Sequence, residues 1–143
     1  MAFSQQIKDL IFNAHKDHCV CMLGTVGEDG PNISPKGSII VLDDEHLAYW
    51  ERAKSAALDN LEKDTRVVVK YSNKAAWEEG DFGQPGGILR FYGTIEFHER
   101  GEFRDKIRTM LPEREINHEG AEEGHAVVIK LERAVNMRGV FVN

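Results

Sequence analysis

Apolar residues recur at helical spacing in three stretches of the 143-residue chain. The first begins near Phe3, and Ser4 is placed to cap its N-terminus because a serine hydroxyl can accept a free backbone N–H of the first turn. The third ends at Pro112, because the residue before a proline disfavours the helical conformation. The predicted helices span residues 3–17, about 55–63 and 103–111.

Elsewhere the chain consists of short β-branched or alternating runs separated by tight turns, a pattern typical of antiparallel strands. Six to eight such strands with inserted helices indicate a mainly β fold, a closed or split antiparallel β-barrel. The runs are too short for a doubly wound parallel sheet, and the chain has no Gly-x-Gly-x-x-Gly or P-loop pattern. The predicted strands are residues 19–26, 32–34, 38–42, 47–50, 66–71, 88–97 and 125–131, with 138–142 as a further short candidate. Residues 73–87 are predicted as a long loop, and the carboxylate-rich residues 113–123 as a solvated loop.

Length and composition favour one globular domain that covers residues 1–143. The net charge is −6, which argues against a nucleic-acid partner because such proteins present a basic surface. No apolar run approaches the roughly 20 residues needed to cross a bilayer, and residues 1–17 do not look like a secretion signal. We therefore expect a cytoplasmic protein with no membrane partner.

Cys19 and Cys21 are the two cysteines of the chain. A disulfide between residues this close in sequence would be strained, and no further soft ligands stand near them at the spacing of a metal site. We expect two buried free thiols and no metal site, with a redox or metal role as the alternative. The six histidines show no ligand spacing either and are expected on the surface or in the core.

The first candidate site lies where a proline and a glycine interrupt two strands, in residues 32–38. Such an interruption predicts a bulge or bend that exposes backbone N–H groups and directs a lysine and two hydroxyls toward one place. The alternative is a plain turn with a solvated lysine. The residues of interest are Ser34, Pro35, Lys36, Gly37 and Ser38.

The second candidate site is the stretch that leads into the helix predicted from residue 55. A helix N-terminus offers unpaired N–H groups and a partial positive charge, so it favours an anion such as a phosphate. Ser55 can add its hydroxyl, Lys54 and Arg52 can add charge, and Trp50 can offer a flat apolar face. The alternative is an ordinary serine cap beside solvated basic residues.

These segments and their order resemble the FMN-binding split-barrel family, which includes pyridoxamine 5′-phosphate oxidase and small bacterial FMN-binding proteins. The resemblance runs from about Phe3 to Val135. It rests on the initial helix, the Gly-Glu-Asp-Gly-Pro hairpin turn, Ser-Pro-Lys-Gly on the next strand, Lys-Ser opening a short helix, and Asn60-Leu61 at its end.

The resemblance implies a homodimer with two FMN sites at the subunit interface. It places the FMN phosphate on Lys54 and Ser55, and the position of Trp77 and the glycine-rich loop after it suggests an approach to the other subunit's flavin. We further hypothesise that Lys36 lies near the N1–C2 edge of the flavin and raises its reduction potential. The other implied contacts with ring, ribityl chain or phosphate are Ser34, Pro35, Lys36, Gly37, Ser38, Trp50 and Glu51.

Two departures separate the chain from the oxidase of this family. Ser55-Ala56-Ala57 stands where the oxidase has Ser-Arg-Lys, so two basic phosphate contacts are missing and Arg52 or Lys54 would have to compensate. The oxidase's Arg-x-His near the C-terminus is also absent, so pyridoxamine phosphate is not the expected substrate.

Three classes of function remain open on the sequence. The first is an FMN-dependent oxidoreductase that acts on a small substrate, and it is the one we favour. The second is a flavin carrier or electron-transfer protein without a substrate of its own. The third is a barrel of the same build that binds a deazaflavin, haem or no such ligand.

Overall fold

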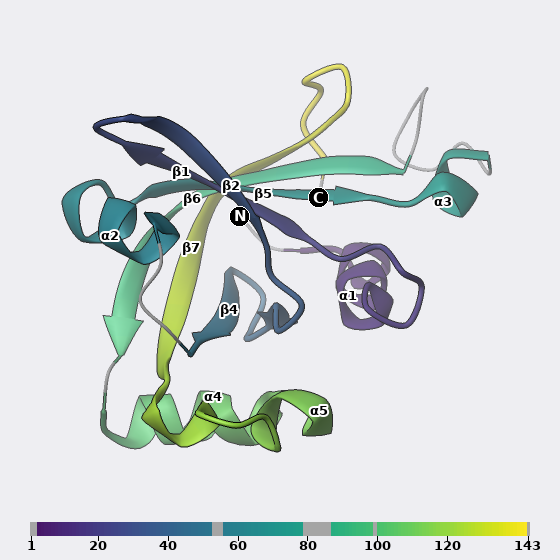
Figure 1. The fold of residues 1–143 in the computed structure, drawn as a ribbon. Coiled ribbons are helices and arrows are strands. Elements are labelled where there is room, and N and C mark those ends of the chain that lie inside the picture. The colour runs from purple at the N-terminus through teal and green to yellow at the C-terminus, as the bar shows by residue number, and fades with distance from the viewer. Residues whose placement is uncertain (1–2, 53–55, 79–86, 99, 143) are drawn as a thin grey trace.

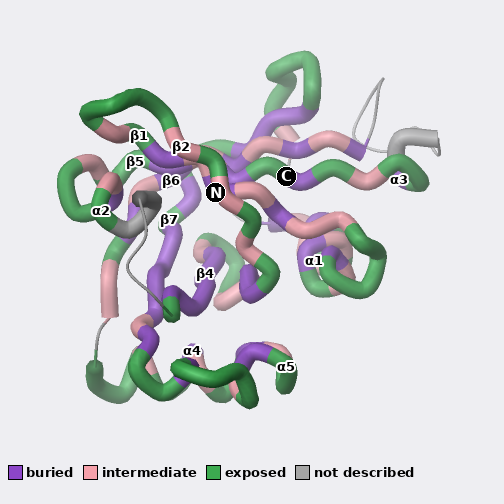
Figure 2. Tube along the Cα trace, viewed as in Figure 1, coloured by how far each residue is buried: buried purple, intermediate pink, exposed green. Residues whose placement is uncertain are grey.

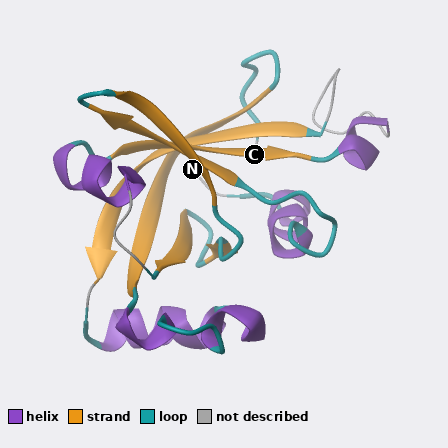
Figure 3. Ribbon diagram, viewed as in Figure 1, coloured by secondary structure: helices purple, strands orange, loops and turns teal. Residues whose placement is uncertain are grey.

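The computed structural model describes residues 3–52, 56–78, 87–98 and 100–142, and its centre is one antiparallel sheet. Seven strands pair in the order β2-β1-β5-β6-β7-β4-β3, and helices surround them (Figures 1 and 3). The strands are β1 (Met22–Gly27), β2 (Gly30–Pro35), β3 (Ile40–Val41), β4 (His46–Glu51), β5 (Arg66–Ser72), β6 (Ile88–His98) and β7 (His125–Asn136).

The two edge strands of this sheet, β2 and β3, follow each other directly in the chain. Pro35 ends β2 and Ile40 begins β3, so the extended chain between them spans at most about 18 Å. The sheet must therefore curl until its edges come close, although no strand pairing joins β2 to β3 among the described residues. The predicted mainly β split barrel is confirmed, and residues 36–39 cross its opening.

The barrel interior is filled by alternate residues of the strands. Leu47 and Tyr49 of β4 meet Val127 and Ile129 of β7 there, and all four side chains are fully buried. Burial of each such side chain contributes about 1.5–3 kcal/mol to folding. Figure 2 shows the buried residues following the strands while the outer faces of the helices remain exposed.

A second, smaller core lies on the outer face of β4 and β7. Ala48 and Trp50 of β4 pack there against Ile107 of α4 (Glu102–Met110) and against Leu111. β4 is thus buried on both faces, which fixes the position of its last residues. The helix predicted over residues 103–111 is confirmed and covers this face.

Helix α1 (Gln5–Asn13) is shorter than the predicted helix over residues 3–17. Ser4 caps it as expected, because its hydroxyl accepts the N–H of Ile7. The α-helix ends at Asn13, where the N–H of Ala14 donates to the carbonyl of Ile11 in a tighter turn. The chain continues in turns as far as His18, whose left-handed conformation lets the N–H of Cys19 donate to the carbonyl of Ala14. The following strand consequently starts at Met22 rather than at residue 19.

Helix α2 (Ala56–Lys63) is held against β1 by the Asn-Leu pair that the resemblance singled out. The side-chain amide of Asn60 donates to the hydroxyl of Thr25 at 3.1 Å, and Leu61 is fully buried in the main core. The pair therefore docks the helix that follows β4.

Other observed element boundaries also differ from the predicted ones. The expected loop over residues 73–87 begins with helix α3 (Lys74–Glu78), and residues 113–124 contain α5 (Glu113–Ile116) and the 3-10 helix η1 (Ala121–Glu123). β3 is shorter than predicted and β2 longer. Residues 138–142 form a single bridge, between Val135 and Phe141, rather than a strand.

In the described ranges of the chain, no helix has both the length and the apolar character required to span a bilayer.

Candidate functional site

The segment between β2 and β3 is bent and tied to the end of β4. The N–H of Lys36 donates to the carbonyl of Cys21 at 2.8 Å, which fixes the start of the bend. The buried hydroxyl of Ser38 accepts from the N–H of Trp50 at 3.1 Å and lies 3.3 Å from its carbonyl oxygen, to which it donates. The predicted bend is present, and it is anchored rather than a free solvated turn.

Lys36 and Glu51 form an ion pair inside the opening of the barrel. Lys36 Nζ lies 2.8 Å from Glu51 Oε2, and the two side chains are only 11% and 9% exposed. The ammonium also lies 5.0 Å from the centre of the Tyr49 ring, a cation–π distance. Burial, and secondarily the Glu51 carboxylate, raise the pKa of Tyr49, so this phenol stays protonated.

A cavity of about 640 Å³ opens beside this bend, within the range of small-molecule sites, and we call it the β2–β3 cavity. It brings together two segments that the sequence singled out separately. Ser34 does not line it; its hydroxyl oxygen is buried and has no hydrogen-bond partner among the described residues. Lys54 and Ser55 lie outside the described residues. The predicted site residues that line the cavity are Pro35, Lys36, Gly37, Ser38, Trp50 and Glu51.

The opposite wall of the β2–β3 cavity was missed by the sequence analysis. Arg52 Nε lies 3.0 Å from Glu115 Oε1, and the guanidinium of Arg114 donates to the carbonyl of Gly37. The expectation of a solvated loop over residues 113–123 is therefore wrong at Glu115, which is buried by these contacts. Ile116, which packs on the outer core, was the one available signal. The added lining residues are His15, Arg114, Glu115, His118, Glu119 and Gly120.

Trp50 holds this wall in place. Its indole is 3% exposed, and the ring N–H donates to the carbonyl of Ala121 at 2.8 Å. The guanidinium of Arg104 stacks 4.7 Å from the indole and donates to the carbonyl of Gly124 at 2.8 Å. The flat face that we expected Trp50 to offer to a ligand is thus covered by Arg104, and the indole instead positions residues 121–124.

The cysteines form no disulfide. Cys21 is buried, and Cys19 is half-buried rather than buried as predicted. Burial raises the pKa of the Cys21 thiol to about 12, so almost no thiolate exists at neutral pH. Within the part of the chain that the structure describes, no three His, Cys, Asp or Glu side chains gather as metal ligands would.

Residues 5–136 match the family model described as pyridoxamine 5′-phosphate oxidase. The chain belongs to the pyridoxamine 5′-phosphate oxidase family. The resemblance stated from the sequence is confirmed. No curated protein matches the sequence.

Solved structures of this family's fold superpose on most of the chain. HupZ of Group A Streptococcus is 23% identical, with 99% of both chains covered and a TM-score of 0.76. A candidate pyridoxamine 5′-phosphate oxidase of Lactobacillus delbrueckii is 24% identical, with 93% of both chains covered and a TM-score of 0.69. An F420 reductase is 17% identical over 81% of this chain and 88% of its own, with a TM-score of 0.58. At these identities the likeness establishes the split-barrel fold alone.

The donors in the β2–β3 cavity fit the kind of cofactor that the pyridoxamine 5′-phosphate oxidase family holds. The backbone N–H groups of Gly37 and Ser38 have no acceptor among the described residues. Two adjacent free N–H groups on a fixed bend suit the carbonyl oxygens of a flavin's pyrimidine ring. Arg114 adds a positive charge to the same wall, where Arg52 is paired with Glu115.

Proposed function

We propose that the chain binds FMN in the β2–β3 cavity. In this proposal the N–H groups of Gly37 and Ser38 hold the pyrimidine edge of the ring, and the phosphate is held by Lys54 and Ser55. The observation that carries the proposal is the pair of unpaired N–H groups on an anchored bend that lines a ligand-sized cavity in a member of this family. Pro35, Lys36, Trp50 and Glu51 line or support the same space.

We infer that the protein is an oxidoreductase that acts on a small substrate. The flavin supplies hydride or single-electron transfer, and the chain supplies orientation, shielding from water and local charge. A carrier of flavin or electrons is the alternative within the same proposal. We further propose a cytoplasmic homodimer with the cofactor at its interface, as the family resemblance implies.

The Lys36–Glu51 ion pair predicts opposite shifts of the flavin potential in two variants. Lys36→Met leaves the Glu51 carboxylate uncompensated and should lower the potential, whereas Glu51→Gln leaves the Lys36 ammonium uncompensated and should raise it. A unit charge near the ring is worth a few kcal/mol at an effective dielectric of about 20, on the order of 50 mV for two electrons. Redox titration of the FMN-loaded proteins measures both shifts.

Lys63→Met removes one charge from the exposed end of α2 and serves as the control for this measurement. Its potential should stay at the wild-type value. Equal potentials in all three variants, or shifts of the same sign for Lys36→Met and Glu51→Gln, would contradict the placement of the ion pair beside the flavin.

The proposed cofactor is tested by absorbance of the purified protein, followed by titration with FMN. FMN bands, or saturable binding of one FMN per chain, support the proposal. The same titration with the deazaflavin F420 tests a second candidate, which the likeness to an F420 reductase favours. Tighter binding of F420 than of FMN, or a haem spectrum in the isolated protein, would overturn the FMN assignment. NADH or NADPH oxidation with turnover would then separate an enzyme from a carrier.

A further inference from the structure

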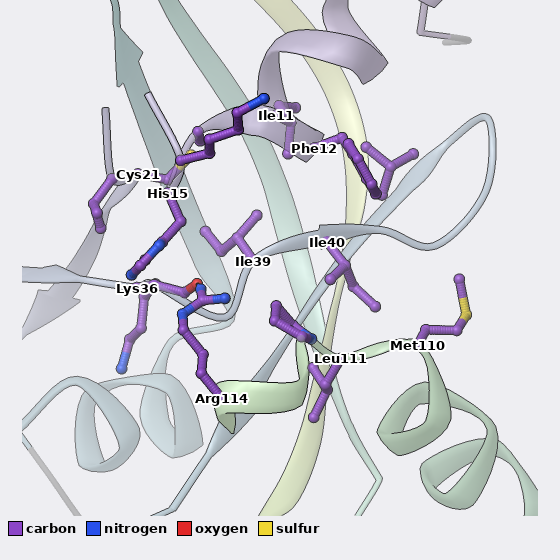
Figure 4. Close-up of a pocket in the computed structure, with 16 residues that line it drawn as sticks. Ile11, Phe12, His15, Cys21, Lys36, Ile39, Ile40, Met110, Leu111 and Arg114 are labelled. Atoms are coloured by element: carbon purple, nitrogen blue, oxygen red, sulfur yellow. The ribbon is translucent and has the colours of Figure 1, made fainter. Parts of the chain in front are cut away.

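A second cavity of about 590 Å³ lies on the other side of the bend, and we call it the α1–α5 cavity. It is bounded by the end of α1, by residues 36–41 and by the turn between α4 and α5 (Figure 4). It shares His15, Lys36, Gly37 and Arg114 with the β2–β3 cavity, so the two spaces adjoin.

The walls of the α1–α5 cavity are largely apolar. Ile39 and Leu111 are buried behind it, and Ile40 is half-buried in its wall (Figure 4). Phe12 and Met110, which also line it, are 86% and 40% exposed. Large apolar side chains left in water around a concave site are typical of a binding surface.

The ionisable side chains that line the α1–α5 cavity, apart from the thiol of Cys21, are all basic. His15, Lys16, Lys36 and Arg114 line it, and none of its described lining residues is Asp or Glu. This excess of basic residues contrasts with the composition of the whole chain, in which 24 acidic residues outnumber 18 basic ones.

Two of these cations lack a carboxylate partner. Lys36 is neutralised by Glu51, but neither Lys16 nor Arg114 forms an ion pair with a described residue. The contact of Arg114 is the uncharged carbonyl of Gly37. A concave site with low-dielectric walls and charge of one sign concentrates ligands of the opposite charge.

We propose that the α1–α5 cavity binds an amphipathic organic anion, with an apolar body and one carboxylate or sulfonate group. The body packs on Ile39, Ile40 and Leu111, the anionic group lies at Arg114, and Lys16 adds a second positive charge to the same cavity. The proposal that the α1–α5 cavity binds a ligand rests only on the features of the cavity described above. Its role as the substrate site rests on the proposed function, because it adjoins the proposed flavin cavity.

The test uses two fluorescent probes with the same rings, the sulfonate 8-anilinonaphthalene-1-sulfonate and the neutral N-phenyl-1-naphthylamine, on the full chain saturated with FMN. The sulfonate should bind at least tenfold more tightly than the neutral probe. Lys16→Gln with Arg114→Gln should weaken sulfonate binding at least tenfold and leave the neutral probe within about twofold. Lys63→Gln with Lys106→Gln removes the same charge outside both cavities and should change neither affinity.

A second pair of variants keeps the basic residues in place. Met110→Glu puts a carboxylate at the exposed part of the wall and should weaken the sulfonate probe selectively, whereas Met110→Gln should not. Displacement of the sulfonate probe by 1-naphthoate and by decanoate is then compared. The stronger competitor shows whether the cavity prefers an aromatic or an aliphatic apolar group.

Three results would overturn the proposal. The two probes could bind with equal affinity, Lys16→Gln with Arg114→Gln could leave sulfonate binding unchanged, or neither carboxylate could displace the sulfonate probe. Competition between FMN and the sulfonate probe would also overturn it, since the probe would then occupy the β2–β3 cavity. If FMN does not bind but the sulfonate still depends on Arg114, the proposed function fails and the anion site stands.

Discussion

Gly93→Ala is expected to destabilise the barrel by more than about 3 kcal/mol, the upper range for overpacking a core. Gly93 lies in the middle of β6, where the pairing with β7 shifts register between Tyr92 and Gly93. A Cβ at this position would lie 2.2 Å from the carbonyl oxygen of Lys130. The clashing atom belongs to the backbone of β7, so the clash can be removed only by moving β6 away from β7. These two strands contribute much of the buried core.

Chemical denaturation followed by far-UV circular dichroism measures this effect as a fall in the unfolding midpoint. Gly37→Ala is the matched control, because its Cβ would meet only ordinary contacts, 3.8 Å from His15 and 3.9 Å from Arg114. It should stay within about 1 kcal/mol of wild type. A Gly93→Ala protein with an unchanged midpoint would show that the two strands can part there at little cost.

The second large effect is expected for Lys54→Glu combined with Ser55→Ala, which should weaken FMN binding by on the order of a hundredfold to a thousandfold. A hydrogen bond to a charged group is worth about 1.5–3 kcal/mol, and the double variant removes two such contacts with the phosphate and adds a negative charge. Both residues lie outside the described ranges, so their assignment comes from the family resemblance.

FMN titration by fluorescence quenching measures this loss. Lys63→Glu, at the other end of α2, makes the same charge change and is expected to leave FMN affinity within about threefold of wild type. Circular dichroism and size-exclusion chromatography check that fold and assembly survive in both proteins. Unchanged affinity in the double variant would mean that the phosphate is held elsewhere, with Arg52 or Arg114 as the next candidates.

The alternation of apolar and polar residues was sufficient to predict most strands of the barrel. Leu89, Phe91, Gly93 and Ile95 of β6 share a buried face as their alternation predicted, and only Phe97 at the end is partly exposed. Strands whose faces differ in burial leave this period-two signal in the sequence. The end of α1 was misjudged because the helix gives way at Ala14 to a tighter turn, which no apolar spacing reveals.

The two halves of the candidate site were found separately in the sequence, and only the family resemblance assigned them to one ligand. Lys36 and Glu51 are 15 residues apart and come together because the sheet curls until its edges adjoin. The sequence led us to expect that the Lys36 charge acts on the flavin, and the fold adds that this charge is paired with Glu51. The wall that contains Glu115 comes from a four-residue helix, too short to leave a periodic signal.

The sequence by itself determined the antiparallel strands, the bend that contains Lys36 and the family, because each depends on the pattern of residues that are neighbours in the chain. The tertiary structure alone decided which charges are paired, that Trp50 faces Arg104, and that the bend separates two cavities. Those features depend on contacts between segments remote in the chain, and such contacts exist only after the barrel has closed around its core.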